Sequence, residues 1–339
     1  MDIAVTAENP VDEDTIARLQ TIAAACIAHD TPDLPPPYRH SFRAQFSHPW
    51  PGREQHWLVA RSAGEPVGYA ELSLPTLDNL DNALLELRVH PEHRRRGVGR
   101  ALYAAVVECA RAAGRKRVLS DSVRAVPGGP PREDVGTPFA RSVGAEAALV
   151  DVRRRLDLTA VDEAALDALS SGAAERAGGY SLVQWRGATP QEYVADVAYL
   201  EGRLSADAPL GDLAWEPEKY DVARIRAFEE ALAARGRQLH HTAARHDASG
   251  RLVAYTTICL LDGVDWHGWQ ETTLVDPVHR GRRLGTLIKV ANLRHVRAAA
   301  PGVRAIDTVN AAVNDHMVAI NEAMGFRQVE AWVDWQHHL

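Results

Sequence analysis

Apolar and polar residues alternate in two segments that lie far apart in the chain. Leu58–Arg61 leads through a Gly-Glu-Pro turn to Val67–Ala70, and Thr242–Arg245 leads through an Asp-Ala-Ser-Gly turn to Val253–Thr256. Alternation with period two, bounded by turn residues, is typical of a half-buried β-hairpin. The pattern therefore predicts one hairpin in each half of the chain.

Helical spacing follows each predicted hairpin. Ala, Leu, Val and Ile recur every three to four residues over Arg100–Ala113 and Thr286–Ala299, which predicts two amphipathic helices. Short apolar strands are predicted after them, at Arg117–Ser120 and Val303–Thr308. Each half therefore runs strand, loop, helix, strand, the order of a crossover unit in an α/β layer.

The two halves also share a local sequence. Val89–Gly99 and Val275–Gly285 coincide at Val, Pro, His, two Arg and the final Gly, at a constant offset of 186 residues. A repeated segment of this kind indicates two copies of one structural unit. Since 339 residues exceed what one hydrophobic core usually supports, two domains are expected.

The boundary between the domains is predicted from composition. Residues 158–179 are rich in Ala, Ser, Asp and Glu and end in a Gly-Gly pair, which is typical of a linker with one short helix. The predicted division is therefore an N-terminal domain over 1–157, a linker over 158–179 and a C-terminal domain over 180–339. A Pro- and Gly-containing loop at 205–212 either connects two helices or lines a substrate cleft.

Composition and charge narrow the class of protein. The chain is 46% hydrophobic and 24% charged, lacks the roughly 18 consecutive apolar residues of a membrane span, and begins with no targeting pattern. A cytoplasmic protein without membrane partners is expected. The net charge of −7 disfavours nucleic acid and suits a cationic or neutral substrate. Three cysteines without a C-x-x-C pair predict free thiols and no metal site.

The repeated loop has the chemistry of an anion site. The first amides of a helix have no internal partners and carry partial positive charge, so they bind phosphate when the preceding loop allows a close approach. Gly97 and Gly99 permit that approach, and the neighbouring arginines at 94, 95, 96 and 100 can add hydrogen bonds. Neither half has the triple glycine of a dinucleotide fold or the Gly-Lys-Ser/Thr of a Walker loop.

The segment Val-x-Pro-x-x-Arg-x-x-Gly-x-Gly between a strand and a helix resembles the acyl-CoA-binding motif of the GNAT superfamily of N-acetyltransferases, in both halves. The resemblance implies an α/β (α+β) fold of two tandem GNAT-like domains, each a mixed, mostly antiparallel sheet flanked by helices. It also implies acetyl-CoA as co-substrate. By this resemblance the co-substrate is placed on Val89, Arg94, Arg95, Arg96, Gly97, Val98, Gly99 and Arg100 in the first half, and on Val275, Arg280, Gly281, Arg283, Leu284, Gly285, Asn310 and Asn314 in the second.

Each half departs from the family pattern in its own way. Arg283 replaces the middle glycine of the second loop, which is compatible with binding if its φ stays helical, although the side chain could narrow the pocket or contact phosphate. The first half keeps the full loop but lacks the late Asn and Gly-Phe signature. The family's tyrosine proton donor is replaced by Ala140 and Asn321, so that another residue or solvent serves, or that half is non-catalytic.

Two glutamates are the candidate general bases, because the attacking amine must lose its proton. Glu86 and Glu271 precede the loops on predicted strands, where family members commonly carry a glutamate, and the alternative for each is an ordinary exposed strand residue. Glu271 lies one step out of register with Glu86 at the 186-residue offset, so the two should not be equivalent. Asp265 and His267 are weaker candidates. The tryptophans are either packing residues or a wall for a cationic substrate.

The sequence therefore favours an acetyl-CoA-dependent N-acyltransferase that moves acetyl to a primary amine of a small molecule by direct attack. One half or both could be catalytic, and the more complete late motif favours the C-terminal half. Two alternatives stay open: a non-catalytic acyl-CoA-binding or regulatory protein, and a protein or peptide N-acetyltransferase. The segments Asp30–Phe46 and Ser205–Trp215 are expected to help select the acceptor, and the protein is expected to be a monomer or homodimer.

Overall fold

A computed structural model describes residues 3–8 and 11–339 of the chain. These residues form two compact units. The N-terminal unit contains the described residues up to Val150 together with Leu210–Trp215 and Glu330–Leu339, and the C-terminal unit contains Asp151–Pro209 and Glu216–Val329. The N-terminal unit therefore includes segments from both halves of the chain, whereas the C-terminal unit is drawn from its middle.

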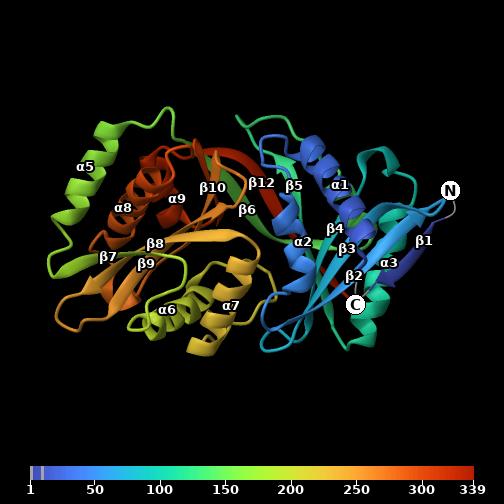
Figure 1. Ribbon diagram of the computed structural model, residues 1–339, viewed down its shortest axis with the longest axis horizontal. Helices are drawn as coiled ribbons and strands as arrows, with labels where there is room; N and C mark the ends of the chain where they lie inside the picture. Colours follow the sequence, from blue (N-terminus) through green and yellow to red (C-terminus); the bar gives the residue numbers. More distant parts are fainter. Residues whose placement is uncertain (1–2, 9–10) are drawn as a thin grey trace. The chain divides into compact units, whose positions relative to one another are not determined.

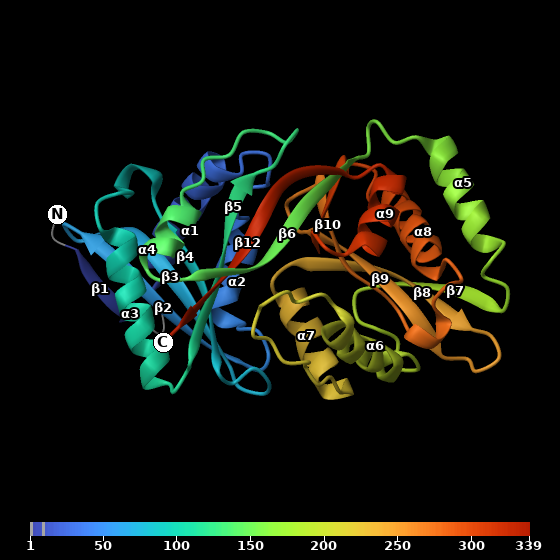
Figure 2. The same ribbon diagram turned by 180° about the vertical axis from the view of Figure 1, so that it is seen from behind.

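The N-terminal unit is built on a twisted sheet with helices on both faces (Figures 1 and 2). Its strands, in spatial order, are β1 (Ala4–Glu8), β2 (Arg53–Ser62), β3 (Glu65–Pro75), β4 (Asn82–Val89), β5 (Arg117–Ala125) and β12 (Arg327–His338). All neighbours are antiparallel except β4 and β5, which are parallel. Its helices are α1 (Glu13–Asp30), α2 (Arg39–Ser47), the 3-10 turn η1 (Pro91–His93), α3 (Val98–Ala112) and α4 (Gly136–Ser142).

The alternation of apolar residues gives this sheet two buried faces. On one face Trp57, Val59 and Tyr69 pack against α1 and α2. On the other face Ala70 and Leu72 pack against α3, because successive strand residues point to opposite sides. The hairpin predicted around Gly64 is β2–β3.

The C-terminal unit repeats the arrangement. Its strands, in spatial order, are β6 (Glu146–Asp157), β11 (Ala305–Ala311), β10 (His267–Val275), β9 (Leu252–Leu261), β8 (Arg237–His246) and β7 (Tyr180–Arg186). Only β10 and β11 are parallel. One face is covered by α6 (Val194–Asp207) and α7 (Val222–Ala234), and the other by α5 (Glu163–Ala174), α8 (Leu284–Ala299) and α9 (Asp315–Met324), with the 3-10 turn η2 (Pro277–His279) before α8. The predicted fold class, two mixed and mostly antiparallel sheets flanked by helices, is confirmed.

Each sheet is completed by a strand from the other half of the sequence. β12 at the end of the chain pairs with β5, and β6, which follows α4, pairs with β11 from Asp151 onward. The predicted division into 1–157, 158–179 and 180–339 stays a prediction. It follows chain order, because composition does not indicate which sheet edge a strand joins. The segment 158–179 contains α5, which packs against α8.

Three further findings bear on the class of protein. In the part of the chain that the structure describes, no helix has the length and apolar character needed to cross a membrane. The three cysteines are free thiols, with Cys26 and Cys259 buried and Cys109 half-buried. Among the described residues, no three His, Cys, Asp or Glu side chains converge as metal ligands would.

Candidate functional site

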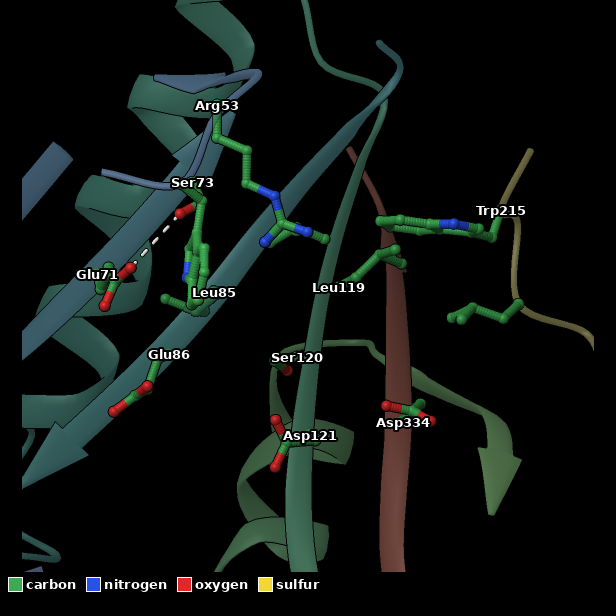
Figure 3. A pocket seen from close by; sticks show the side chains of 13 residues that line it. Arg53, Glu71, Ser73, Leu85, Glu86, Leu119, Ser120, Asp121, Trp215 and Asp334 are labelled. Carbon is green, nitrogen blue, oxygen red and sulfur yellow. Dashed lines mark hydrogen bonds between the residues drawn. The ribbon is translucent and has the colours of Figure 1, made fainter. Parts of the chain in front are cut away.

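The two parallel strands of each unit separate part of the way along. In the N-terminal unit, β4 and β5 pair from Asn82–Arg117 to Leu84–Leu119 and then diverge, as Figure 3 shows below Leu85 and Leu119. In the C-terminal unit, β10 and β11 pair from His267–Ala305 to Gln270–Thr308. Backbone groups that leave a ladder need other partners, so a divergence of this kind can receive an extended ligand.

The loop after the diverging strand has one backbone conformation in both units. Arg95 and Gly97 adopt left-handed φ values of 59° and 89°, and Gly281 and Arg283 adopt 79° and 55°. Glycine and arginine exchange places, but both positions stay left-handed. Arg283 therefore does not have a helical φ. Its Nη1 lies 3.3 Å from where a Cβ on Gly172 of α5 would stand, so its side chain lies against α5.

The helices that follow these loops begin without a capping side chain. α1, α5 and α7 each start at an aspartate that accepts an amide hydrogen bond, whereas α3 and α8 start at left-handed Gly97 and Arg283 with no side-chain cap. The first helical bonds run from the Ala101 amide to Gly97 and from the Leu287 amide to Arg283. The preceding amides therefore point out of the helix start, ready to bind an anion.

The first arginine of each loop holds the loop in place. Arg94 donates to both carboxylate oxygens of Asp30 at 2.7 and 2.6 Å and, through Nε, to the Val89 carbonyl at 3.1 Å. Burial alone would raise the pKa of Asp30, but the hydrogen bond and charge of Arg94 outweigh it and lower that pKa. Arg94 thus ties the end of β4 to the end of α1.

The C-terminal unit repeats this tie. Arg280 donates to Asp207 at the end of α6 at 2.7 Å and to the Val275 carbonyl at 3.1 Å. The direct phosphate contacts predicted for Arg94 and Arg280 stay a prediction, because in the structure these guanidinium groups contact the protein. Arg95, Arg96 and Arg100 are exposed around the start of α3.

The two candidate bases occupy matching positions. Glu86 is exposed and bonded to Arg88 at 2.5 Å, and the Glu271 side chain is 46% exposed and 4.0 Å from Arg237. A bulge between Gln270 and Thr273 adds a residue to β10. Glu86 lies two residues beyond Leu84, which pairs with Leu119 of β5, and Glu271 lies two residues beyond Trp269, which pairs with Asp307 of β11. The expectation that they are not equivalent is therefore wrong, because the bulge creates the one-residue offset.

The structure adds a carboxyl group that the sequence reasoning missed. Glu201 on α6 accepts a hydrogen bond from the Tyr255 hydroxyl. Burial, together with the charges of Glu218 and Glu271, raises the pKa of Glu201 to about 7. A glutamate within a helix carries no local sequence signal of what packs over it.

The late asparagines bond within the protein. Asn314 is the N-cap of α9 and accepts from the Met317 amide at 3.3 Å, while Asn310 accepts from Asn321 at 2.6 Å. Contacts from Asn310 and Asn314 to the co-substrate stay a prediction. His267, a weaker candidate base, is buried and bonded to Asp307 at 2.8 Å, which makes it part of the sheet interior.

A cavity of about 350 Å³ lies where β4 and β5 separate in the N-terminal unit (Figure 3). It is lined by Trp50, Arg53, Glu71, Ser73, Leu84, Leu85, Glu86, Leu119, Ser120, Asp121, Leu213, Trp215 and Asp334. Leu213 and Trp215 come just after the 205–212 loop. Trp50 and Trp215 line the cavity, whereas Trp57 and Trp335 are core residues.

The chain is similar to known proteins over most of its length. Residues 23–127 match the model of the Acetyltransferase (GNAT) family. The chain is 32% identical to a solved tandem GNAT protein from the clavulanic acid biosynthesis pathway, covering 99% of this chain and 98% of that one, with a TM-score of 0.84. It is 27% identical over 266 residues to mycothiol acetyltransferase of Saccharopolyspora erythraea, 73% of this chain and 74% of the relative. A GCN5-related N-acetyltransferase from Sphaerobacter thermophilus shares the fold at 16% identity, over 98% and 95% of the two chains, with a TM-score of 0.64.

Proposed function

The chain belongs to the GNAT family of acetyltransferases, and we propose that it transfers acetyl from acetyl-CoA to a primary amine of a small molecule. One observation carries the proposal. In each unit one of the two diverging parallel strands, β4 or β10, is followed by a loop with left-handed residues and by an uncapped helix start. This arrangement suits a long ligand with an anionic diphosphate at one end and a reactive group between the strands.

The chemistry requires little beyond positioning and one proton acceptor. The amine nitrogen attacks the thioester carbonyl carbon and the C–N bond forms. The C–S bond then breaks, and CoA leaves as its thiolate. Glu86 or Glu271, two residues beyond a parallel pair, would take the proton that the amine loses. The diphosphate would be bound by the amides at the start of α3 or α8. No covalent enzyme intermediate is needed.

The units offer different support for catalysis. The N-terminal unit has glycines at 97 and 99 and a cavity at the strand divergence that includes Glu86. The C-terminal unit has the β10 bulge, Glu271 and the buried Glu201. We therefore propose acetyl-CoA binding in both units, with acceptor chemistry at the N-terminal cavity.

Two substitutions test co-substrate binding. Gly99→Glu and Gly285→Glu each place a carboxylate beside the helix start, and Gly99→Gln and Gly285→Gln are the matched neutral controls. A Cβ at Gly285 would stand 3.6 Å from Ile320, which is ordinary contact, and one at Gly99 would stand 3.3 Å from the Phe139 ring, which needs a small shift. The Gln variants measure that steric cost separately.

Like charges about 4 Å apart repel by about 1 kcal/mol in water and about 4 kcal/mol near a protein surface. At the altered helix start, each Glu variant should therefore bind acetyl-CoA at least about fivefold more weakly than its Gln control, and calorimetry should show one of the two binding events weakened. Two binding events that keep their wild-type affinity in both Glu variants would refute the proposal. Binding that is normal in wild type without CoA release from any amine would favour the non-catalytic alternative.

A further inference from the structure

The segment between β5 and α4 is longer than the matching segment of the C-terminal unit. Val126–Val135 separates β5 from α4, whereas residues 312–314 separate β11 from α9. Prolines at 127, 130 and 131 fix φ, and a tight turn is closed by a bond from the Gly129 amide to the Val126 carbonyl. The segment 126–135 is therefore a stiff connection outside helices and strands, and we call it the strap.

One arginine anchors the strap at two places. The Arg132 guanidinium donates through Nε to Glu330 on β12 at 2.5 Å, and through Nη2 to Asp33 in the segment between α1 and α2. The Arg132 side chain is 3% exposed, that of Glu330 is fully buried and that of Asp33 is 27% exposed. Glu330 also accepts from the Trp332 indole at 3.0 Å. Arg132 is thus held between two carboxylates from opposite ends of the chain.

The two anchors lie on the two sides of the opening between β4 and β5. Asp33 stands on the β4 side, because it closely follows Asp30, which Arg94 ties to the end of β4. Glu330 stands on the β5 side, because it is the cross-strand partner of Ala125, the last residue of β5. The strap therefore connects both sides of the opening at the end where the strands have parted.

The anchors also place the strap on one face of the sheet. Side chains alternate along a strand, so Glu330 points to the same side as Asp334, which lines the cavity with Glu86. Figure 3 shows Glu86 on β4 and Asp334 on β12 on the two sides of the opening. This face is the one that α1 and α2 cover, since Trp57, which packs on those helices, lies opposite Glu71 of the cavity. The strap therefore crosses the opening on the α1–α2 face.

The burial and the geometry of the Arg132 bridge indicate a role in positioning. A buried ion pair adds little net stability over apolar packing, because the cost of desolvation offsets the attraction. What it does supply is a fixed arrangement of the groups that it joins. A planar guanidinium bonds two carboxylates in a defined geometry, which a lysine ammonium does not. The bridge from Asp33 to Glu330 therefore fixes how the two sides of the opening are held.

Resting on the proposed function, we propose that Arg132 is a positioning residue that closes the strap over the pantetheine arm of acetyl-CoA in the N-terminal unit. With the diphosphate at the start of α3 and the thioester near Glu86, the arm lies in the opening between β4 and β5. The bridge between Asp33 and Glu330 then passes over the arm on the α1–α2 face. It retains the arm between the strands and holds the thioester in place for the acceptor amine.

Two strap variants and two ligands test this role on the full chain. Arg132→Gln removes the bridge and Asp33→Asn removes its anchor on the β4 side. Glu133→Gln is the matched control, because Glu133 is the next residue of the strap and its side chain is 66% exposed. The ligands are acetyl-CoA and 3′-phosphoadenosine 5′-diphosphate, which keeps the diphosphate but lacks the arm. Calorimetry follows the binding event that Gly99→Glu weakens, which belongs to the N-terminal unit.

Arg132→Gln and Asp33→Asn should each raise the Kd for acetyl-CoA about tenfold, the equivalent of one lost charge-assisted hydrogen bond. The Kd for the nucleotide without the arm should stay within about twofold of wild type, because the start of α3 is unchanged. The double variant should bind no more weakly than either single variant, because the bridge needs both anchors. Glu133→Gln should bind both ligands as wild type does. If Arg132→Gln does not fold, as judged by its melting temperature, the partly exposed Asp33 still provides the test.

The outcomes separate the strap from the proposed function. Absence of acetyl-CoA binding to the N-terminal unit in wild type would refute the proposed function, and the role of the strap with it. Unchanged Kd values for both ligands in both strap variants would leave the co-substrate site standing and overturn the role of Arg132. Equal weakening of both ligands would also overturn it, because a general loss of structure does not distinguish the arm from the diphosphate.

Discussion

Asp307 is expected to be the most sensitive single carboxylate in the C-terminal unit. It is fully buried on β11 and accepts from Arg153 at 2.6 Å, from Arg155 at 2.7 Å through Nε and through Nη2, and from His267 at 2.8 Å. These partners come from β6 and β10, the two neighbours of β11, so the cluster joins three strands. It lies at the closed end of the divergence and holds β10 and β11 together there.

Asp307→Asn keeps the shape but removes the charge that the two arginines require. Breaking a buried ion pair by removing one partner costs about 3–5 kcal/mol, because the remaining charge is left in the interior. For a unit of this size each kcal/mol lowers the melting temperature by about 2–4 °C, so the expected drop is about 6–20 °C. Asp167→Asn is the matched control, since Asp167 is 72% exposed and pairs with Arg294 at the surface.

The assay is denaturant unfolding with calorimetry, repeated across pH. Burial by itself would raise the pKa of Asp307, but hydrogen bonds from Arg155 and His267 and the charge of Arg153 hold it far below its ordinary value. A lowered carboxyl pKa stabilises the fold above the unfolded value near 4, and this contribution disappears as pH falls below it. The difference between wild type and Asp307→Asn should therefore be constant from pH 5 to 8, as a plateau of about 3–5 kcal/mol, and shrink in acid. A loss no greater than that of Asp167→Asn, within about 1 kcal/mol, would refute the reasoning.

Two further predictions concern the two sites. Asp30→Asn should weaken acetyl-CoA binding at the N-terminal loop by about tenfold, since Arg94 loses a charge-assisted bond of about 1.5–3 kcal/mol, and calorimetry with unchanged affinity would show that the tie is dispensable. Glu201→Gln should remove a pH dependence of stability. Because the pKa of Glu201 is raised to about 7, the stability of the wild type should fall as pH rises from the unfolded-state pKa of about 4.3 to pH 7. The melting temperatures of wild type and variant should therefore cross as pH rises, and parallel curves would exclude this role.

Much of the candidate site was predictable because it is local in the sequence. The anion loops depend on left-handed residues just before a helix, and Gly97 and Gly281 mark such positions within a few residues of the helix start. The matching register of Glu86 and Glu271 was not predictable, because a bulge is defined by pairing with a neighbouring strand. The role of Arg94 depends on Asp30, 64 residues earlier, and no pattern around either residue reports their contact.

The sequence by itself determined the repeat, the strand-loop-helix order and the chemistry of the helix starts. Hydrophobic periodicity, the backbone freedom of glycine and the electrostatics of helix ends each act over only a few residues. Only the tertiary structure decided which strand completes each sheet, and that choice sets the charge at the site. Because β12 pairs with β5 and β6 pairs with β11, Asp334 lies opposite Asp121 in one unit. In the other unit, Arg153 and Arg155 of β6 neutralise Asp307. Pairing between distant strands depends on sheet edges and burial, so two copies of one motif acquired opposite charge at the same position of the sheet.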